Sequence, residues 1–190
     1  MRLYLGLVHY PVYDKNEEKI ASAITTVDLH DLSRASRTYA VKQLLVITPL
    51  TDQQRLVERV CRHWITGFGA QYNPHRKEAV ELISVVSSLK GAIASIAVLE
   101  GEMPFVVATG ARERKEKVIS FAETRSMVRR NDLVFLIFGT AWGLAQEAFG
   151  MTDAVLEPIP GAGGYNHLSV RSASAIILDR LAGNHTSRDF

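Results

Sequence analysis

The chain contains very little cysteine and no long apolar run, and these two absences exclude several classes of protein. Cys61 is the only cysteine among the 190 residues, so neither an intramolecular disulfide framework nor a cysteine-based metal site is expected. No apolar run approaches the roughly 20 residues that a membrane helix needs. Met1-Arg2 passes directly into a strand pattern, without the cleavage site of a signal peptide. We therefore expect a cytoplasmic protein with no membrane segment and no bound metal.

Two common nucleotide-binding signatures are also missing. No glycine loop is followed by Gly-Lys-Ser or Gly-Lys-Thr, so the chain has no P-loop. In the glycine-rich stretch at 161–164, Asn166 stands where the third glycine of a dinucleotide fingerprint belongs. No acidic residue follows at the required spacing of about 20 positions. These absences argue against NAD and against ATP bound through a P-loop.

Neither sign of charge is in large excess. The formal net charge is +2, with 47% hydrophobic and 22% charged residues, which is typical of one globular domain spanning 1–190. So small a net charge does not by itself indicate nucleic-acid binding. Basic residues do gather at 112–117 and at 125–130, where phosphate contacts and a plain solvated face are both open alternatives.

Short apolar runs alternate with helical patterns, which predicts an α/β fold with a doubly wound parallel sheet. Strands are expected at 3–8, 21–27, 43–47, 105–108, 133–138 and 154–156. Helices are expected after a cap at Asp28, after a cap at Thr51 or Asp52, from about 74 to 89, and after a cap at Ser169. Residues 93–99 fit a helix or a strand.

Three of the expected strands end in loops that carry glycine. The loops lie at 109–110, 139–140 and 159–167, and open parallel sheets bind ligands at the carboxyl ends of their strands. Glycine also lets a ligand approach the main chain closely. The pattern therefore predicts a ligand pocket, although an ordinary strand, turn and helix is an equally good interpretation of the residues alone.

Three segments carry a resemblance to a known family. PIPGAGGYNHLSVRSASAIILDRL, which ends at Leu181, resembles the last conserved motif of the SPOUT superfamily of RNA methyltransferases. It is most similar to the bacterial tRNA (guanine-N1)-methyltransferase branch. PFVVATGAR at 104–112 and LVFLIFGTAWGL at 133–144 resemble the first and second motifs. The resemblance does not include the C-terminal RNA-binding domain of that branch, because the chain ends soon after Leu181.

The resemblance implies a SPOUT-like doubly wound parallel sheet with a C-terminal deep trefoil knot that binds S-adenosylmethionine. It implies methyl transfer to RNA, either tRNA or rRNA, by a homodimer whose subunits meet near the small residues at 172–175. A catalytically inactive SPOUT-fold protein that binds RNA or the cofactor and serves a regulatory role is the alternative.

The same motifs assign site residues one by one. The resemblance implies that Arg112, which matches the arginine of the first motif, is the catalytic residue; otherwise it is a surface arginine paired with Glu113 or Glu116. The cofactor-binding residues that it implies are Thr109, Gly110, Phe138, Gly139, Thr140, Leu156, Pro158, Ile159, Gly163, Gly164, Tyr165, Asn166, His167, Leu168 and Val170.

Overall fold

The computed structural model describes residues 1–112, 117–163 and 165–184, and its centre is a seven-stranded sheet in the order β5-β4-β1-β8-β6-β9-β7. Its strands are β1 (Leu3–Val8), β4 (Gln43–Ile47), β5 (Ile83–Val86), β6 (Phe105–Ala108), β7 (Val118–Ile119), β8 (Val134–Gly139) and β9 (Ala154–Leu156). Every pairing in this sheet is parallel, which confirms the predicted fold class. Two short strands, β2 (Val12–Tyr13) and β3 (Lys19–Ile20), form a separate antiparallel hairpin.

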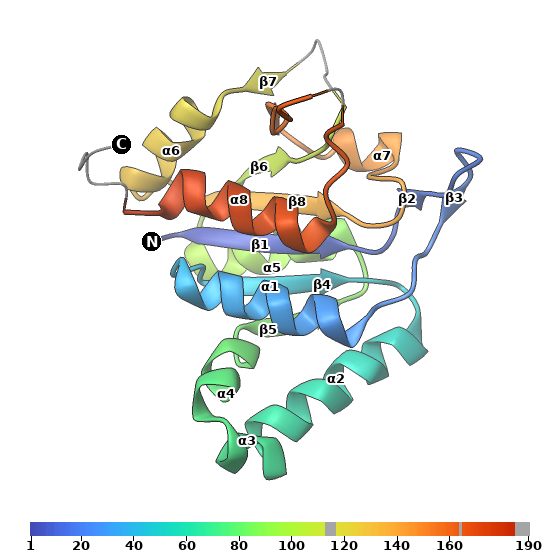
Figure 1. The fold of residues 1–190 in the computed structure, drawn as a ribbon, viewed down its shortest axis with the longest axis vertical. Coiled ribbons are helices and arrows are strands. Elements are labelled where there is room, and N and C mark those ends of the chain that lie inside the picture. Colours follow the sequence, from blue (N-terminus) through green and yellow to red (C-terminus); the bar gives the residue numbers. More distant parts are fainter. Residues whose placement is uncertain (113–116, 164, 185–190) are drawn as a thin grey trace.

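Helices cover both faces of the sheet (Figure 1). They are α1 (Thr26–Thr38), α2 (Thr51–Ile65), α3 (Phe68–Tyr72), α4 (Pro74–Val80), α5 (Leu89–Glu100), α6 (Phe121–Arg129), α7 (Gln146–Phe149) and α8 (Val170–Ala182). Helices α1, α6 and α8 share one apolar core with the sheet, and α5 shares the core on the opposite face with α7. The sheet is therefore doubly wound, as the alternation of elements predicted.

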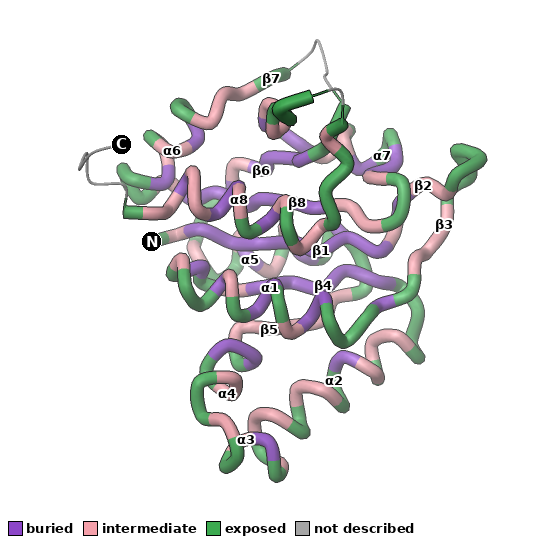
Figure 2. Tube along the Cα trace, in the orientation of Figure 1, coloured by how far each residue is buried: buried purple, intermediate pink, exposed green. Residues whose placement is uncertain are grey.

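The central strand β1 shows why the apolar runs are continuous. All six of its residues are buried, because a parallel sheet with helices on both faces has no wet side. Leu5 belongs to the core under α1 and α8, whereas Tyr4 belongs to the core under α5. Figure 2 shows the same burial along β1, β4 and β8.

The predicted helix at 74–89 is wrong in its second half. Pro74 does open a helix, but α4 ends at Val80, and Ile83–Val86 is β5, which extends the sheet beside β4. Residues 79, 82, 83 and 86 have helical spacing only by coincidence, because they divide among a helix, the turn after it and a strand. The ambiguous stretch at 93–99 lies inside α5.

The other errors concern helix starts. The strand expected at 21–27 does not form; β3 ends at Ile20 and α1 begins at Thr26. Thr25, and not Asp28, is the cap of α1, since the Thr25 side chain accepts a hydrogen bond from the Asp28 backbone N–H. Helix α2 begins at Thr51 after Leu50 and has no side-chain cap. The cap at Ser169 is confirmed.

At the amino-terminal edge of the sheet, the Glu100 carboxylate joins three segments of the chain. It accepts hydrogen bonds from Arg2 Nε at 2.9 Å, from the Tyr4 hydroxyl at 2.5 Å and from Lys42 Nζ at 2.6 Å. The Glu100 side chain is only 7% exposed. Hydrogen bonds from Lys42 and Tyr4 lower the pKa of Glu100 from 4.5 to about 2.

The first prediction is that this carboxylate sets part of the acid stability. A lowered folded-state pKa stabilises the fold above pH 4.5, and the contribution is lost as the pH falls from 4.5 toward 2. Glu100→Gln is expected to lower the free energy of unfolding at pH 7 by about 1–2 kcal/mol, because a buried acceptor loses its charge. Urea unfolding from pH 7 to pH 2 measures this, and the variant should show a flatter decline below pH 4.5.

Glu102→Gln is the matched control, because Glu102 also pairs with Arg2 but its side chain is 56% exposed. It should leave both the free energy at pH 7 and the acid profile close to those of the unsubstituted protein. An acid profile that Glu100→Gln does not change would contradict the assignment.

Candidate functional site

A cavity of about 880 Å³ opens where β6, β8 and β9 end. Its walls come from three loops, at 109–112, 138–144 and 155–170, and from residues 22–28 before and within the first turn of α1. The loops meet because parallel strands present their carboxyl ends at one edge of the sheet. The volume lies within the range of small-molecule sites.

The structure brings the predicted cofactor residues together around this cavity and a second one beside it. Those that line the larger cavity are Thr109, Gly110, Phe138, Gly139, Thr140, Ile159, Tyr165, Asn166, His167, Leu168 and Val170. Leu156, Pro158 and Gly163 line the adjacent cavity of about 720 Å³ instead. The two cavities share four lining residues, Val155, Glu157, Ile159 and Asn166. Gly164 lies outside the described residues.

The second loop is fixed against the chain that follows β1. Thr140 N–H donates to the Val8 carbonyl at 3.2 Å, and Tyr13 N–H donates to the Gly143 carbonyl at 2.9 Å. The loop folds back so tightly that a Cβ on Gly139 would lie 2.7 Å from Leu144 N. Glycine is therefore required at 139 by the protein itself, whereas a Cβ on Gly110 would meet nothing within 4 Å.

The third loop is tied to the first. The Asn166 side-chain amide donates to the Ala111 carbonyl at 2.7 Å. Farther back along the loop, a Glu157 carboxylate oxygen accepts a hydrogen bond from Phe121 N–H at 2.6 Å, which connects the cavity wall to the start of α6. Tyr165 is 74% exposed, and its ring meets the ring of His167 edge to face, with centroids 5.4 Å apart.

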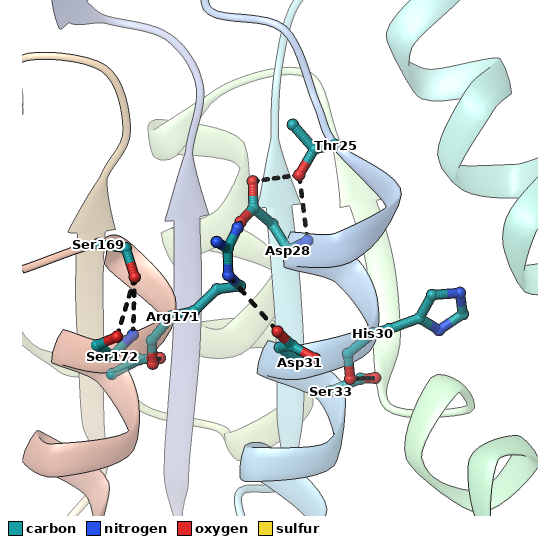
Figure 3. A network of polar contacts seen from close by, with 9 residues as sticks. Thr25, Asp28, His30, Asp31, Ser33, Ser169, Arg171 and Ser172 are labelled. Carbon is teal, nitrogen blue, oxygen red and sulfur yellow. Dashed lines mark hydrogen bonds and ion pairs between the residues drawn. The ribbon is translucent and has the colours of Figure 1, made fainter.

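An ion pair that sequence reasoning missed, between Asp28 and Arg171, lies on the α1 side of the cavity, and its acidic member lines the wall. Asp28 lines the cavity and is only 7% exposed. Its carboxylate accepts from Arg171 Nη1 at 2.6 Å and from the Thr25 hydroxyl at 2.6 Å, as Figure 3 shows. Arg171 Nε also lies 3.5 Å from an Asp31 carboxylate oxygen. A Thr-x-x-Asp pattern at 25–28 was the available signal, since it places Asp28 in the first helical turn.

A neutral polar chain reaches the same cavity from the core. His9 is fully buried, and its Nδ1 lies 2.9 Å from the Ser22 hydroxyl, which in turn lies 2.5 Å from the Thr140 hydroxyl. Burial lowers the pKa of His9 to about 4, so the imidazole is neutral at physiological pH. Ser22 and Thr140 line the cavity. Their hydroxyl groups are therefore connected by hydrogen bonds to the neutral imidazole of His9.

Arg112 lies at the mouth of the cavity and is largely solvent-exposed. Its Nη1 is 3.9 Å from a Glu17 carboxylate oxygen in the hairpin, and both side chains are 79% exposed. An ion pair of this kind holds the guanidinium weakly. The alternative partners Glu113 and Glu116, and most of the basic run at 112–117, lie outside the described residues. Of the second basic group, Arg125 donates to the Gly183 carbonyl and Arg130 pairs with Asp132.

Within residues 1–112, 117–163 and 165–184, no three His, Cys, Asp or Glu side chains are grouped so as to hold a metal ion. None of the helices in this part of the chain combines the length and apolar character that a membrane crossing requires.

The fold has close counterparts among solved structures. A probable methyltransferase from Bordetella pertussis Tohama I superposes with a TM-score of 0.65, covering 95% of this chain and 94% of that chain. Its sequence is 16% identical, so the likeness establishes the shared fold and nothing more.

Sequence relatives are much nearer. Two proteins named tRNA (guanine-N(1)-)-methyltransferase, from Oleidesulfovibrio alaskensis and Nitratidesulfovibrio vulgaris, are 42% and 44% identical over 182 residues. These matches include 96% of this chain but 42% of each relative, so the chain spans about two-fifths of their length. Residues 2–183 match a family described as SAM-dependent RNA methyltransferase. The chain therefore belongs to the family of S-adenosylmethionine-dependent RNA methyltransferases.

Proposed function

We propose that this chain is a cytoplasmic enzyme that transfers a methyl group from S-adenosylmethionine to RNA, either tRNA or rRNA. The observation that carries the proposal is the convergence of the three motif loops on one cavity of about 880 Å³. Family membership supplies the reaction class. The chain acts as one domain over 1–190 and requires no metal, because methyl transfer from a sulfonium needs no Lewis acid.

The cofactor is held mainly by the backbone of the three loops. The bare main chain at Gly110 and the loop at 138–140 receive the adenosine, as the motif resemblance implies. Asp28 and Glu157 also line the cavity, and both carboxylates are engaged within the protein, Asp28 by Arg171 and Glu157 by Phe121 N–H.

We infer that the C-terminal segment forms the deep trefoil knot of the SPOUT fold. The path of the chain supports this inference. After β9, which lies beyond β6 in the sheet, the chain returns beside the first loop at Asn166 and continues into α8. Helix α8 packs against both α1 and α6. The loops that hold the cofactor are then also the crossing points of the knot.

In the reaction, the bond from sulfur to the methyl group breaks as a bond from an RNA nitrogen or oxygen to the same carbon forms. S-adenosylhomocysteine leaves, and the nucleophile gives its proton to a base or to water. Holding the two reactants in line supplies most of the rate. Arg112, at the cavity mouth, orients the nucleotide by binding its phosphate or base edge, because a guanidinium does not release a proton.

Incubation of the purified protein with methyl-labelled S-adenosylmethionine and total RNA from its own cells tests the proposal directly. Label should enter tRNA or rRNA, and mapping of the labelled nucleotide identifies the atom methylated. Binding of S-adenosylmethionine without any transfer to RNA would favour the catalytically inactive, regulatory alternative.

The second prediction separates cofactor contact from loop structure. Gly110→Val is expected to weaken S-adenosylmethionine binding by roughly tenfold or more, since its side chain enters open space in the cavity. Its thermal midpoint should stay near that of the unsubstituted protein. Gly139→Val should lower both the S-adenosylmethionine affinity and the thermal midpoint, because a Cβ at this position collides with Leu144. Calorimetric titration and thermal unfolding measure the two quantities, and unchanged affinity in Gly110→Val would contradict the placement of the cofactor.

The third prediction concerns Arg112. Arg112→Ala should leave S-adenosylmethionine affinity nearly unchanged while methyl transfer falls by roughly ten- to a hundredfold, the loss expected for a positioning group. Single-turnover transfer to the mapped RNA measures the effect. Arg130→Ala is the control, because Arg130 is similarly exposed and pairs only at the surface with Asp132. Equal turnover in both variants would remove Arg112 from the reaction.

The fourth prediction is a homodimer formed through α8. Ser172 and Ala175 are exposed on this helix, and small side chains permit close approach of a second helix. Sedimentation at micromolar concentration should show a dimer that Ala175→Arg dissociates. Ala94→Arg, on the exposed side of α5, should remain dimeric. A monomeric unsubstituted protein would rule out an active site shared between subunits.

A further inference from the structure

Two aromatic rings stand in solvent at the corner formed by α2, α3 and α4. Phe68 is 74% exposed and Tyr72 is 75% exposed. They are four residues apart on α3 and so share one helix face, and their rings are stacked with centroids 6.0 Å apart and planes at 23°. In Figure 1 this corner is at one end of the long axis of the molecule, and β7 is at the other end. The rings therefore lie away from the cofactor cavity.

The packing beneath α3 forces these rings outward. A Cβ on Gly69 would lie 2.6 Å from the Trp64 ring, and one on Gly67 would lie 2.8 Å from the His63 carbonyl oxygen. The two glycines let α3 close onto the end of α2, with Phe68 between them pointing away. Helix α4 in turn packs against Trp64, because the Arg76 guanidinium lies over the Trp64 ring, 4.4 Å from its centroid. The exposed rings thus rest on a tightly packed base.

Cations predominate in the stretch of sequence that carries the rings. From Arg59 to Lys77 the sequence holds four arginine or lysine residues and two histidines, and it has no aspartate or glutamate. Arg59 and Arg62 are exposed on α2, beside α3. Glu58 and Glu78 directly flank the stretch. Glu78 pairs with Arg37, and Lys77 Nζ lies 3.9 Å from a Glu81 carboxylate oxygen.

We propose that Phe68 and Tyr72 form a stacking platform for unpaired bases of the RNA substrate, with the surrounding cations contacting its phosphates. The proposal rests on RNA being the substrate and adds where a part of that RNA distant from the methylated nucleotide is held. Every base has a face that stacks on an aromatic ring, and basic residues beside such rings follow the backbone. A protein partner is the less favoured occupant, because the stretch that carries the rings is rich in cations and charged residues are depleted at the core of protein interfaces.

The test measures RNA affinity by fluorescence anisotropy with a labelled, unstructured 12-nucleotide RNA and with tRNA. Phe68→Ala/Tyr72→Ala is expected to weaken binding of both by about tenfold or more, as loss of stacking on two rings implies. Phe68→Trp/Tyr72→Phe should bind as tightly as the unsubstituted protein, because both positions stay aromatic. Arg59→Gln/Arg62→Gln should weaken binding and reduce its dependence on salt.

Val98→Ala/Leu99→Ala is the matched control, since these α5 side chains are 84% and 65% exposed but carry no aromatic ring. It should leave RNA affinity unchanged. S-adenosylmethionine affinity, measured by calorimetry, should be the same in all of these variants, which reports that the fold is intact.

Failure of the stacking platform and failure of the RNA-substrate proposal give different results. If the unsubstituted protein binds RNA and Phe68→Ala/Tyr72→Ala binds it equally well, the platform is wrong while the methyltransferase proposal stands. If the unsubstituted protein binds S-adenosylmethionine but binds neither the 12-nucleotide RNA nor tRNA, the proposal that RNA is the substrate is wrong. A change in sedimentation of Phe68→Ala/Tyr72→Ala with unchanged RNA affinity would identify the corner as a protein contact and overturn the proposal.

Discussion

The pairing of β8 between β1 and β6 determines where the functional loops of this chain lie. Val8 pairs with Gly139 on one side, and Ala108 pairs with Ile137 on the other, so the three strands end almost level. β9 then pairs with β6 through Ala108 and Val155, which brings the third loop to the same height. Because the side-chain period of a strand is two, a slip of one residue would exchange the faces of these buried strands and displace the loops together.

The sequence predicted the parts of the fold whose signal is local and missed those that depend on partners. β1, β4, β6, β8 and β9 were predicted because strands buried on both faces are continuous apolar runs. The two-residue strand β7 is defined by its pairing with β9, and no run that short has a pattern. β5 was assigned to a helix because four apolar residues at 79–86 fit helical spacing, although the chain turns after Val80.

For the candidate site too, the sequence revealed local features and missed contacts between residues far apart in the chain. Glycine loops after strands were visible in the sequence, and the motif resemblance assigned them to the cofactor. The contact between Asp28 and Arg171 joins residues 143 positions apart, so no spacing rule finds it. His9 was likewise unremarkable in sequence, since its buried contact with Ser22 and the lowered pKa depend on the closure of the loop after β1.

The charged groups around the cavity are mostly engaged within the protein, which favours a separate surface for the RNA. Asp28, Glu157 and Arg112 all line the cavity, and Asp28 pairs with Arg171 while a Glu157 oxygen accepts from Phe121 N–H. The Glu100 carboxylate is engaged at the opposite edge of the sheet, by Lys42. The backbone of an RNA that extends beyond the cavity is attracted by cations outside it. Arg112 stands at the rim of the cavity, and the cations of α2 and α4 stand farther along the molecule, where phosphates are attracted without entering the cofactor site.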